Sequence, residues 1–418
     1  MGEARPQQPI LRQGYLPYDI VLNILARLPV KSVIRFRYIS KSYNSSITAP
    51  NFISTHLKNI KDSHDNDNDS DNGFVIHMPS VTDNIGFQRP VCTVALDRTF
   101  DKISELGIPF DFHYIYTQIV GSCNGLLCLA NSANVVYLWN PSIRIFKRLP
   151  DTCLGRLKDV TLGFAYHPEN NDYKVVRISC LSLFTHEIEV YTLSSDSWRS
   201  VGTTGLTATN VMVYDKNHPL PIPLVNGALH WVSNVVEGEE NHRSRMVMAF
   251  DVNSERFREL ALPDGSVDEN TFQTFLALFK GKLASIVWEH SEQPGTRYSI
   301  WVMKEYGVIE SWNKLFVVPF EGVAYCIAFT EYGSLLVRYI NDQVEAQGFK
   351  FVLVDTETLH EKKDPDIQHY SSVATFMESL VLFDGANVVS YWAYGGVHIR
   401  SEVIIGMDKL NPLLFISF

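Results

Sequence analysis

The apolar positions of residues 16–57 follow helical spacing that is punctuated by two Leu-Pro steps. Leu16-Pro17 and Leu28-Pro29 predict two helix starts, because proline is accepted in the first turn of a helix and breaks a helix interior. After each step, apolar residues recur at one-, three- and four-residue intervals, which places them along one face of a helix. These residues are Ile20, Val21, Ile24, Leu25 and Leu28, then Val30, Val33 and Ile34. A third helix is expected around Ser40 to Ile47, and a short fourth after Ala49-Pro50.

From Gly73 onward the pattern changes to short β-branched and aromatic runs separated by Gly, Asn, Asp and Pro, which indicates strands and turns. Turn dipeptides precede an apolar run at Asn124-Gly125, Asn226-Gly227, Lys280-Gly281, Tyr332-Gly333 and Asp384-Gly385. The intervals between these glycines are 102, 54, 52 and 52 residues. Because Asn171-Asp172 divides the first interval, the sequence repeats with a period of about fifty residues.

A second apolar run ends in a polar turn within each unit, so the repeating element is a hairpin. Two of these units end in the same Ser-Trp dipeptide, at Ser197-Trp198 and Ser311-Trp312. Radial repeats of this length are typical of a β-propeller, and six turn positions predict six blades. Strands from 73–118 and from 385–418 are expected to complete one blade together and close the ring. The kelch double glycine and the WD dipeptide are missing, so an irregular β-sandwich is the alternative.

Between the helices and the strands lies a polar run, KDSHDNDNDSDN, at residues 61–72. It contains five aspartates and predicts a linker or loop. The run does not fit a calcium-binding EF-hand loop, because Asn72 and Met78 hold the positions that need Gly and Glu. The sequence therefore predicts an α+β multidomain chain. Its parts are a disordered N-terminus (1–14), a helical domain (15–60), an acidic linker (61–72) and an all-β propeller (73–418).

Charge is unevenly distributed over the 418 residues. The chain carries a net charge of −10, yet residues 15–60 carry +5 and the remainder −15. The basic residues of the helical segment are Arg27, Lys31, Arg35, Arg37, Lys41 and Lys58, and its one acid is Asp19. A basic patch favours an acidic partner. With a sequence pI near 5.7 and no zinc-finger or RNP pattern, a protein is favoured over nucleic acid. The acidic remainder favours a basic client by the same reasoning.

The N-terminus lacks the apolar run of a signal peptide, and the sequence contains no run of eighteen apolar residues that could span a membrane. A cytoplasmic or nuclear location is therefore expected. The six cysteines are scattered without a CxxC pair, which predicts reduced thiols and neither disulfides nor a zinc site. No cofactor is expected.

The sequence predicts no catalytic site. Gly121-Ser122-Cys123-Asn124-Gly125 has the outline of a nucleophile elbow, but an apolar strand follows it where a helix is required, so Asn124-Gly125 is interpreted as a turn. The histidines are dispersed, and His230-Trp231 is expected in the core or on a blade surface. Glu187 and Glu189 share one side of a strand and are interpreted as a solvated face.

Residues 16–57 resemble the F-box of plant F-box proteins. The resemblance is carried by LPYDIVLNILARLPVKSVIRFR at 16–37 and KSYNSSITAPNFISTHL at 41–57. Three positions depart from the family pattern: Asn23 replaces Glu, Ser40 replaces Cys and Tyr43 replaces Trp. The resemblance implies that this segment binds a Skp-type adaptor and, through it, a cullin scaffold. The expected adaptor-binding residues are Leu16, Pro17, Ile20, Val21, Ile24, Leu25, Leu28, Pro29, Val30 and Val33. The alternative is a helical subdomain packed on its own chain.

The β-rich part resembles the F-box-associated domain of plant F-box proteins, including the S-locus F-box group. The matching stretches include VGSCNGLLCL at 120–129, LWNPSIRIFKRLP at 138–150 and NGALHWV at 226–232. The resemblance implies a non-catalytic substrate receptor of a Skp-cullin-F-box ubiquitin ligase. The resemblance also implies that the client is a protein. For a member of the S-locus group, this client would resemble a secreted pistil ribonuclease.

Four irregular stretches are expected to include the client-binding loops, since propellers bind through loops at one face. They are Gly202–Pro223, Glu237–Arg245, Asp264–Asn270 and Glu289–Arg297. Two alternatives stay open. One is a propeller enzyme or lectin whose helices only pack on the blades, and the other is an F-box protein that binds the adaptor without directing ubiquitination.

Overall fold

The computed structural model describes residues 16–66, 74–79, 91–96, 102–108, 117–131, 133–152, 159–182, 185–201, 211–237, 242–264, 271–290, 295–330, 332–340, 350–363, 371–381, 388–394 and 397–401. The chain divides into two compact units, Met1–Asn68 and Asp69–Phe418. The predicted disordered N-terminus lies outside the described residues.

The first unit contains four helices: α1 (Tyr18–Leu25), α2 (Val30–Phe36), α3 (Lys41–Ile47) and α4 (Pro50–Asn66). Pro17 and Pro29 stand directly before α1 and α2, which confirms the two predicted starts. The Pro17 carbonyl accepts hydrogen bonds from the Ile20 and Val21 amides at 3.0 and 3.1 Å, and thereby begins the helical ladder. The fourth helix is longer than predicted. It continues through residues 61–66, so the first half of the expected linker is helical.

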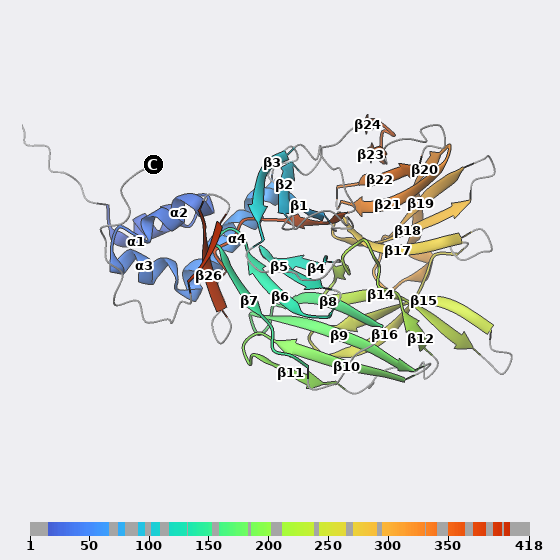
Figure 1. The fold of residues 1–418 in the computed structure, drawn as a ribbon, viewed down its shortest axis with the longest axis horizontal. Coiled ribbons are helices and arrows are strands. Elements are labelled where there is room, and N and C mark those ends of the chain that lie inside the picture. Colours follow the sequence, from blue (N-terminus) through green and yellow to red (C-terminus); the bar gives the residue numbers. More distant parts are fainter. Residues whose placement is uncertain are drawn as a thin grey trace, which may run out of the picture. The chain divides into compact units, whose positions relative to one another are not determined.

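The second unit is an all-β propeller, as predicted (Figure 1). Its described strands form six antiparallel sheets, a number equal to that of the predicted blades, and we number the sheets along the chain. Blade 1 contains β4 (Thr117–Cys123), β5 (Leu126–Asn131), β6 (Val136–Asn140), β7 (Ile145–Arg148), β26 (Val388–Tyr394) and β27 (Val397–Ser401). Blade 2 contains β8 (Val160–His167), β9 (Asp172–Ser182), β10 (Thr185–Thr192) and β11 (Ser197–Ser200). Blade 3 contains β12 (Val211–Tyr214), β13 (Leu224–Val225), β14 (Ala228–Glu237), β15 (His242–Asp251) and β16 (Arg256–Ala261).

The remaining blades complete the ring. Blade 4 contains β17 (Thr271–Phe279), β18 (Lys282–His290), β19 (Thr296–Met303) and β20 (Trp312–Phe320), with the short 3₁₀ helix η1 (Ile309–Ser311) before β20. Blade 5 contains β21 (Val323–Phe329), β22 (Ser334–Ile340), β23 (Lys350–Asp355) and β24 (Glu361–Lys363). Blade 6 contains β25 (Ser371–Phe376), β1 (Phe74–Pro79), β2 (Val91–Leu96) and β3 (Lys102–Gly107).

The prediction that strands from 73–118 and from 385–418 share one blade is wrong, because β1, β2 and β3 pair with β25 in blade 6, whereas β26 and β27 join blade 1. In blade 6, β25 pairs with β1 along its whole length, from Phe74 opposite Phe376 to Pro79 opposite Ser371. Blade 1 also gains a late strand, because β26 pairs with β7. Neighbouring blades contact one another through β4 and β8, β8 and β14, β14 and β17, β21 and β25, and β25 and β4. This closed ring rules out the alternative of an irregular sandwich.

Left-handed backbone positions explain the repeated turns. Asn124, Asn226 and Lys280 have φ between 47° and 53°, and the glycine after each has φ between 74° and 80°. Two successive residues with positive φ form the tight turn that matches the twist of a two-residue hairpin, which is why Gly follows Asn in the sequence. Cys123 pairs with Leu126 across the first of these turns. The interpretation of Asn124-Gly125 as a turn is therefore confirmed.

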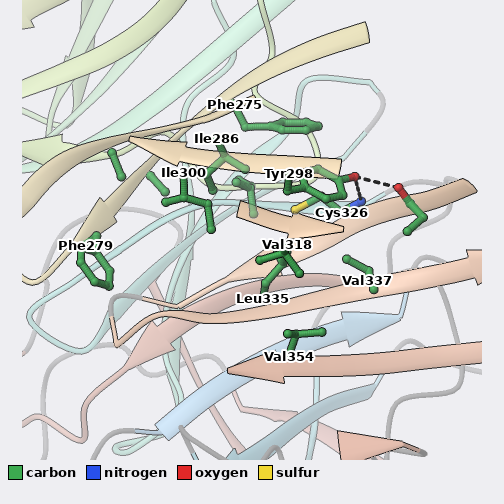
Figure 2. Close-up of a cluster of buried hydrophobic side chains, with 14 of the residues drawn as sticks. Phe275, Phe279, Ile286, Tyr298, Ile300, Val318, Cys326, Leu335, Val337 and Val354 are labelled. Atoms are coloured by element: carbon green, nitrogen blue, oxygen red, sulfur yellow. Dashed lines mark hydrogen bonds between the residues drawn. The ribbon is translucent and has the colours of Figure 1, made fainter. Parts of the chain in front are cut away.

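The apolar cores lie between neighbouring blades, and the largest one joins blades 4 and 5 (Figure 2). Tyr298 is fully buried there among aliphatic side chains. Its hydroxyl donates to the Ala324 carbonyl at 2.9 Å and accepts from the Cys326 amide at 2.7 Å, both in the next blade. Burial raises the pKa of Tyr298 well above its usual value, so the hydroxyl stays a donor.

Two tryptophans join successive blades in the same way. The Trp198 indole donates to the Pro150 carbonyl at 2.8 Å, and the Trp312 indole donates to the Ala261 carbonyl at 3.0 Å. Pro150 lies just beyond β7 of blade 1, and Ala261 is the last residue of β16 of blade 3, so each carbonyl belongs to the blade that precedes the tryptophan in the chain. The Ser-Trp repeat in the sequence thus marks a common contact between blades, in addition to a common register.

Candidate protein-binding surfaces

The first helix presents an apolar face to solvent. Leu16, Ile20 and Ile24 are 59%, 48% and 46% exposed. Ile20 and Ile24 are four residues apart and therefore lie on one side of α1, and Leu16 precedes the helix, directly before Pro17. Three large aliphatic side chains exposed in a row are unusual for a solvated helix, and such a patch is typical of a protein interface.

The other expected adaptor-binding residues divide into two groups. Pro17 and Pro29 are exposed, and Val21 and Leu28 are half-buried. Leu25, Val30 and Val33 are buried, with at most 1% of their surface exposed. In this structure the last three form part of the apolar core, so they position the exposed residues and do not form the surface.

The fourth helix supports the turn between α1 and α2. The His56 ring donates from Nε2 to the Leu28 carbonyl at 2.9 Å, and the Asn59 amide donates to the Ala26 carbonyl at 2.9 Å. These are carbonyls at the end of α1 that the helix itself leaves without partners. Burial lowers the pKa of His56, so the neutral ring is favoured.

The three departures from the family pattern are accommodated locally. Ser40 caps α3, since its hydroxyl accepts a hydrogen bond from the Tyr43 amide at 3.2 Å. The Tyr43 ring lies 5.2 Å from that of Tyr18 and 6.3 Å from that of Phe36. Asn23 accepts a hydrogen bond from the Arg27 side chain at 3.3 Å, one turn along α1.

Two exposed apolar residues were not predicted from the sequence. Tyr38 and Ile39 are 70% and 61% exposed in the turn between α2 and α3. They lie outside the helical periodicity on which the prediction relied. An aromatic and an aliphatic residue directly before the capping Ser40 were the available signal.

The basic residues of the helical unit are mostly exposed to solvent. Arg27, Lys31, Arg35, Lys41 and Lys58 are exposed. Arg37 is half-buried, donates to the Asn44 side chain at 3.0 Å and has its pKa lowered by burial. Exposed basic side chains are complementary to an acidic protein partner, which stays a prediction.

The four predicted client-binding stretches extend from one and the same end of the propeller sheets. Successive strands alternate in direction, and each stretch follows β11, β14, β16 or β18, which run toward that end. Residues 202–210, 238–241, 265–270 and 291–294 lie outside the described part of the chain.

One predicted stretch serves a different role in its described portion. Residues 215–223 leave blade 3 after β12 and cross to other blades before rejoining at β13. Asn217 exchanges hydrogen bonds with the Leu276 backbone at 2.8 Å, and the Ile222 amide donates to the Val120 carbonyl at 3.4 Å. Leu220 and Ile222 are buried. This segment links blades 1, 3 and 4 and is therefore structural.

The residues considered for catalysis occupy structural positions. Cys123 precedes a tight turn. Trp231 is fully buried, and His230 is also buried, with its ring bonded to Pro223 and Tyr306. Glu189 is buried rather than solvated, since it pairs with Arg177 and accepts from Thr152. Within the described residues no group of three or more His, Cys, Asp or Glu side chains could hold a metal ion. None of the described helices combines the length and apolarity that crossing a bilayer requires.

Comparison with known families decides the identity of both units. The F-box domain family matches residues 15–55, and the F-box associated β-propeller domain family matches residues 87–339. The chain is a plant F-box protein. An Arabidopsis thaliana F-box/kelch-repeat protein is 29% identical over 317 residues, covering 73% of this chain and 79% of the relative. The F-box protein CPR1 of Arabidopsis thaliana is 28% identical, covering 72% of this chain and 73% of the relative.

Solved structures resemble this F-box protein more distantly. TolB from Acinetobacter baumannii superposes with a TM-score of 0.46 at 9% identity, covering 79% of this chain and 73% of that chain. This likeness says nothing about what the F-box protein binds. The two matched domains identify it in general terms as a substrate-recognition subunit of Skp-cullin-F-box complexes, in which the F-box binds the adaptor.

Proposed function

We propose that this F-box protein recruits a protein client to a cullin ligase for ubiquitination and degradation. The observation that carries the proposal is the exposed row of Leu16, Ile20 and Ile24 on a helical unit that already has a buried core. The propeller, held rigid by contacts between its blades, would bind the client and raise its concentration near the ubiquitin donor. A cytoplasmic or nuclear location is part of this proposal.

The adaptor-binding face comprises Leu16, Pro17, Ile20 and Ile24, with Pro29 and the half-buried Val21 and Leu28 at its border. Leu25, Val30 and Val33 act indirectly, by fixing the helices. The exposed lysines and arginines would steer an acidic adaptor surface toward this face. The client is a protein, and a pistil ribonuclease remains one hypothesis for its identity.

The proposal is tested by replacing Leu16 and Pro17 together with Ala in the full chain co-expressed with a Skp-type adaptor. Loss of an interface anchor costs ~2 kcal/mol, so the adaptor affinity should fall roughly thirtyfold or more. Calorimetric titration measures the affinity. Val323→Ala, which removes a propeller side chain that is 40% exposed, is the matched control and should bind normally. Undiminished adaptor binding by the double variant would contradict the proposal.

Client turnover is a separate readout. A client identified by proximity labelling should accumulate when the proteasome is inhibited. The same client should also accumulate in cells that carry the variant with Ala in place of Leu16 and Pro17. A client that binds the propeller but whose abundance responds to neither treatment would indicate that the protein binds without directing ubiquitination.

A further inference from the structure

The segment at residues 215–223, which joins β12 to β13 in blade 3, is bonded to three different blades. Its backbone amides donate to the Val120 carbonyl of blade 1 at 3.4 Å and to the Val232 carbonyl of blade 3 at 2.8 Å. The Asn217 side chain exchanges hydrogen bonds with the Leu276 backbone of blade 4. The segment therefore extends well beyond the blade to which it belongs in the sequence.

The three remaining blades have contacts with the same segment. Ile222 is part of the apolar core shared by blades 2 and 3, and Leu220 is part of the core shared by blades 4 and 5. The Ser372 hydroxyl of blade 6 lies 3.5 Å from the Pro219 carbonyl oxygen. The same hydroxyl accepts from the Ile119 amide of blade 1 at 3.1 Å. One short segment thus contributes to the packing of all six blades.

These contacts place the segment at the axis of the ring. The blades follow one another in chain order around the ring, so blades 1 and 4 stand opposite each other among the six. Val120 and Leu276 lie on β4 and β17, which are the first strands of these two opposite blades. A segment that bonds to both must cross the centre of the ring. In a propeller this centre is a channel that the blades surround.

Asn217 fixes the segment in this place. Its side-chain Nδ2 donates to the Leu276 carbonyl and its Oδ1 accepts from the Leu276 amide, both at 2.8 Å. The amide group thereby exchanges the same two hydrogen bonds with Leu276 that a neighbouring antiparallel strand would exchange. Nδ2 also donates to the Pro221 carbonyl at 2.9 Å and closes the turn of the segment itself. Asn217 has a φ of 53°, a left-handed conformation in which asparagine is enriched.

Side chains of the segment divide between the core and solvent. Asn217, Leu220 and Ile222 are at most 5% exposed. Lys216 and His218, which alternate with them at the start of the segment, are exposed. The segment therefore packs against the blades through its buried side chains and remains in contact with water on its other side.

We infer that residues 215–223 form an internal plug, which closes the central channel of the propeller and locks its six blades together. The ring axis is then not available to a ligand, and a partner of the propeller binds to its loops and outer strands. This inference concerns the propeller alone and does not depend on the proposed function. It predicts that release of the plug loosens blades 1, 4 and 6 together, although their first strands are distant in the sequence.

Hydrogen exchange of the full chain tests the locking role. Asn217→Gly keeps the left-handed backbone, which glycine adopts freely, and removes the amide group that bonds Leu276. Amide exchange in β4, β17 and β25 should accelerate together by about tenfold or more, because buried backbone groups of Leu276 lose their partner and the segment is released.

Asn226→Gly is the matched control. Asn226 belongs to the same blade and has a φ of 49°, but it is exposed in a hairpin turn. The control should leave exchange in β4, β17 and β25 unchanged. The locking role is overturned if the control accelerates exchange in these strands equally, or if Asn217→Gly accelerates β17 alone or none of the three. Both variants should retain native adaptor affinity, so the result is independent of the receptor role.

Hydroxyl-radical footprinting of the native chain tests the placement of the segment without any substitution. His218 should be oxidised, whereas Leu220 should be protected as well as the fully buried Leu335. Leu359, which is 50% exposed, provides the reactive reference. If Leu220 is oxidised as readily as Leu359, the segment does not fill the channel and the inference is wrong.

Discussion

The helical unit and the propeller use apolar residues in different ways. The helices are short, with seven or eight residues in each of the first three, and they leave Leu16, Ile20 and Ile24 exposed. In the propeller, by contrast, every residue of β5 is buried, and within the described residues the exposed large apolar side chains all belong to blades 4 and 5. A small unit has too little volume to bury all of its apolar surface, whereas a ring of sheets has enough.

The difference separates two kinds of interface. On the helical unit the binding surface is the apolar face of a helix, so its loss affects binding directly. In the propeller the stability lies in the contacts between blades, such as the two tryptophan–carbonyl hydrogen bonds. The two units should therefore respond to mutation independently, and the following predictions test this separation.

The largest effect is expected from Trp231→Ala. The Trp231 side chain is fully buried, and its indole donates to the Thr161 hydroxyl of the neighbouring blade at 3.2 Å. Removing a buried tryptophan costs about 3–5 kcal/mol of the free energy of unfolding. Urea unfolding of the full chain should show this loss in the transition of the propeller, while adaptor affinity at low urea stays unchanged.

Trp301→Ala provides the control, because its half-exposed ring lies at the surface beneath Lys314. It should destabilise the propeller far less. If Trp231→Ala reduces adaptor affinity under conditions where the helices remain folded, the two units are coupled and the separation is wrong.

Local chemistry explains which features could be predicted from the sequence. Pro17 and Pro29 set helix starts through their own backbones, and Asn-Gly pairs set turns through positive φ, so both signals act within a few residues. Because these turns recur about every fifty residues, they also predicted a ring of six blades. The match to known families confirmed the fold and the general role.

Features that depend on distant neighbours could not be predicted. Ile20 and Val30 follow the same apolar spacing, yet Ile20 is 48% exposed and Val30 is fully buried, because burial depends on which helix packs opposite. The sequence of residues 215–223 predicts only an irregular loop, because its hydrogen-bond partners Leu276 and Val120 are distant in the sequence.

A second prediction concerns acid stability and involves His230. Burial lowers the pKa of this ring to about 4, with a further contribution from nearby Arg258. The unfolded chain, in which a histidine has a pKa of about 6.5, takes up the proton first, so stability should fall as the pH drops below that value. Between pH 7 and pH 5 the loss from this residue is about 2 kcal/mol.

Urea unfolding of the propeller at the two pH values measures this loss, and His230→Gln should remove most of it. His56→Gln is the comparison, because His56 is a buried histidine of the helical unit whose pKa is also lowered by burial. It should leave the pH dependence of the propeller transition unchanged. An equal effect of both variants on that transition would show that the two units unfold together.

The smallest effect is expected at Ser40, where the helical unit departs from its family. The Ser40 hydroxyl accepts from the Tyr43 amide, and loss of such a cap costs ~1 kcal/mol of helix stability. In Ser40→Ala, hydrogen exchange of the α3 amides should therefore accelerate about fivefold, while Ser40→Thr keeps the cap and changes little. Exchange in the propeller strands should be the same in both variants. If Ser40→Ala also accelerates exchange in β5 or β14, the cap stabilises more than its own helix, and the separation of the two units fails at its most sensitive point.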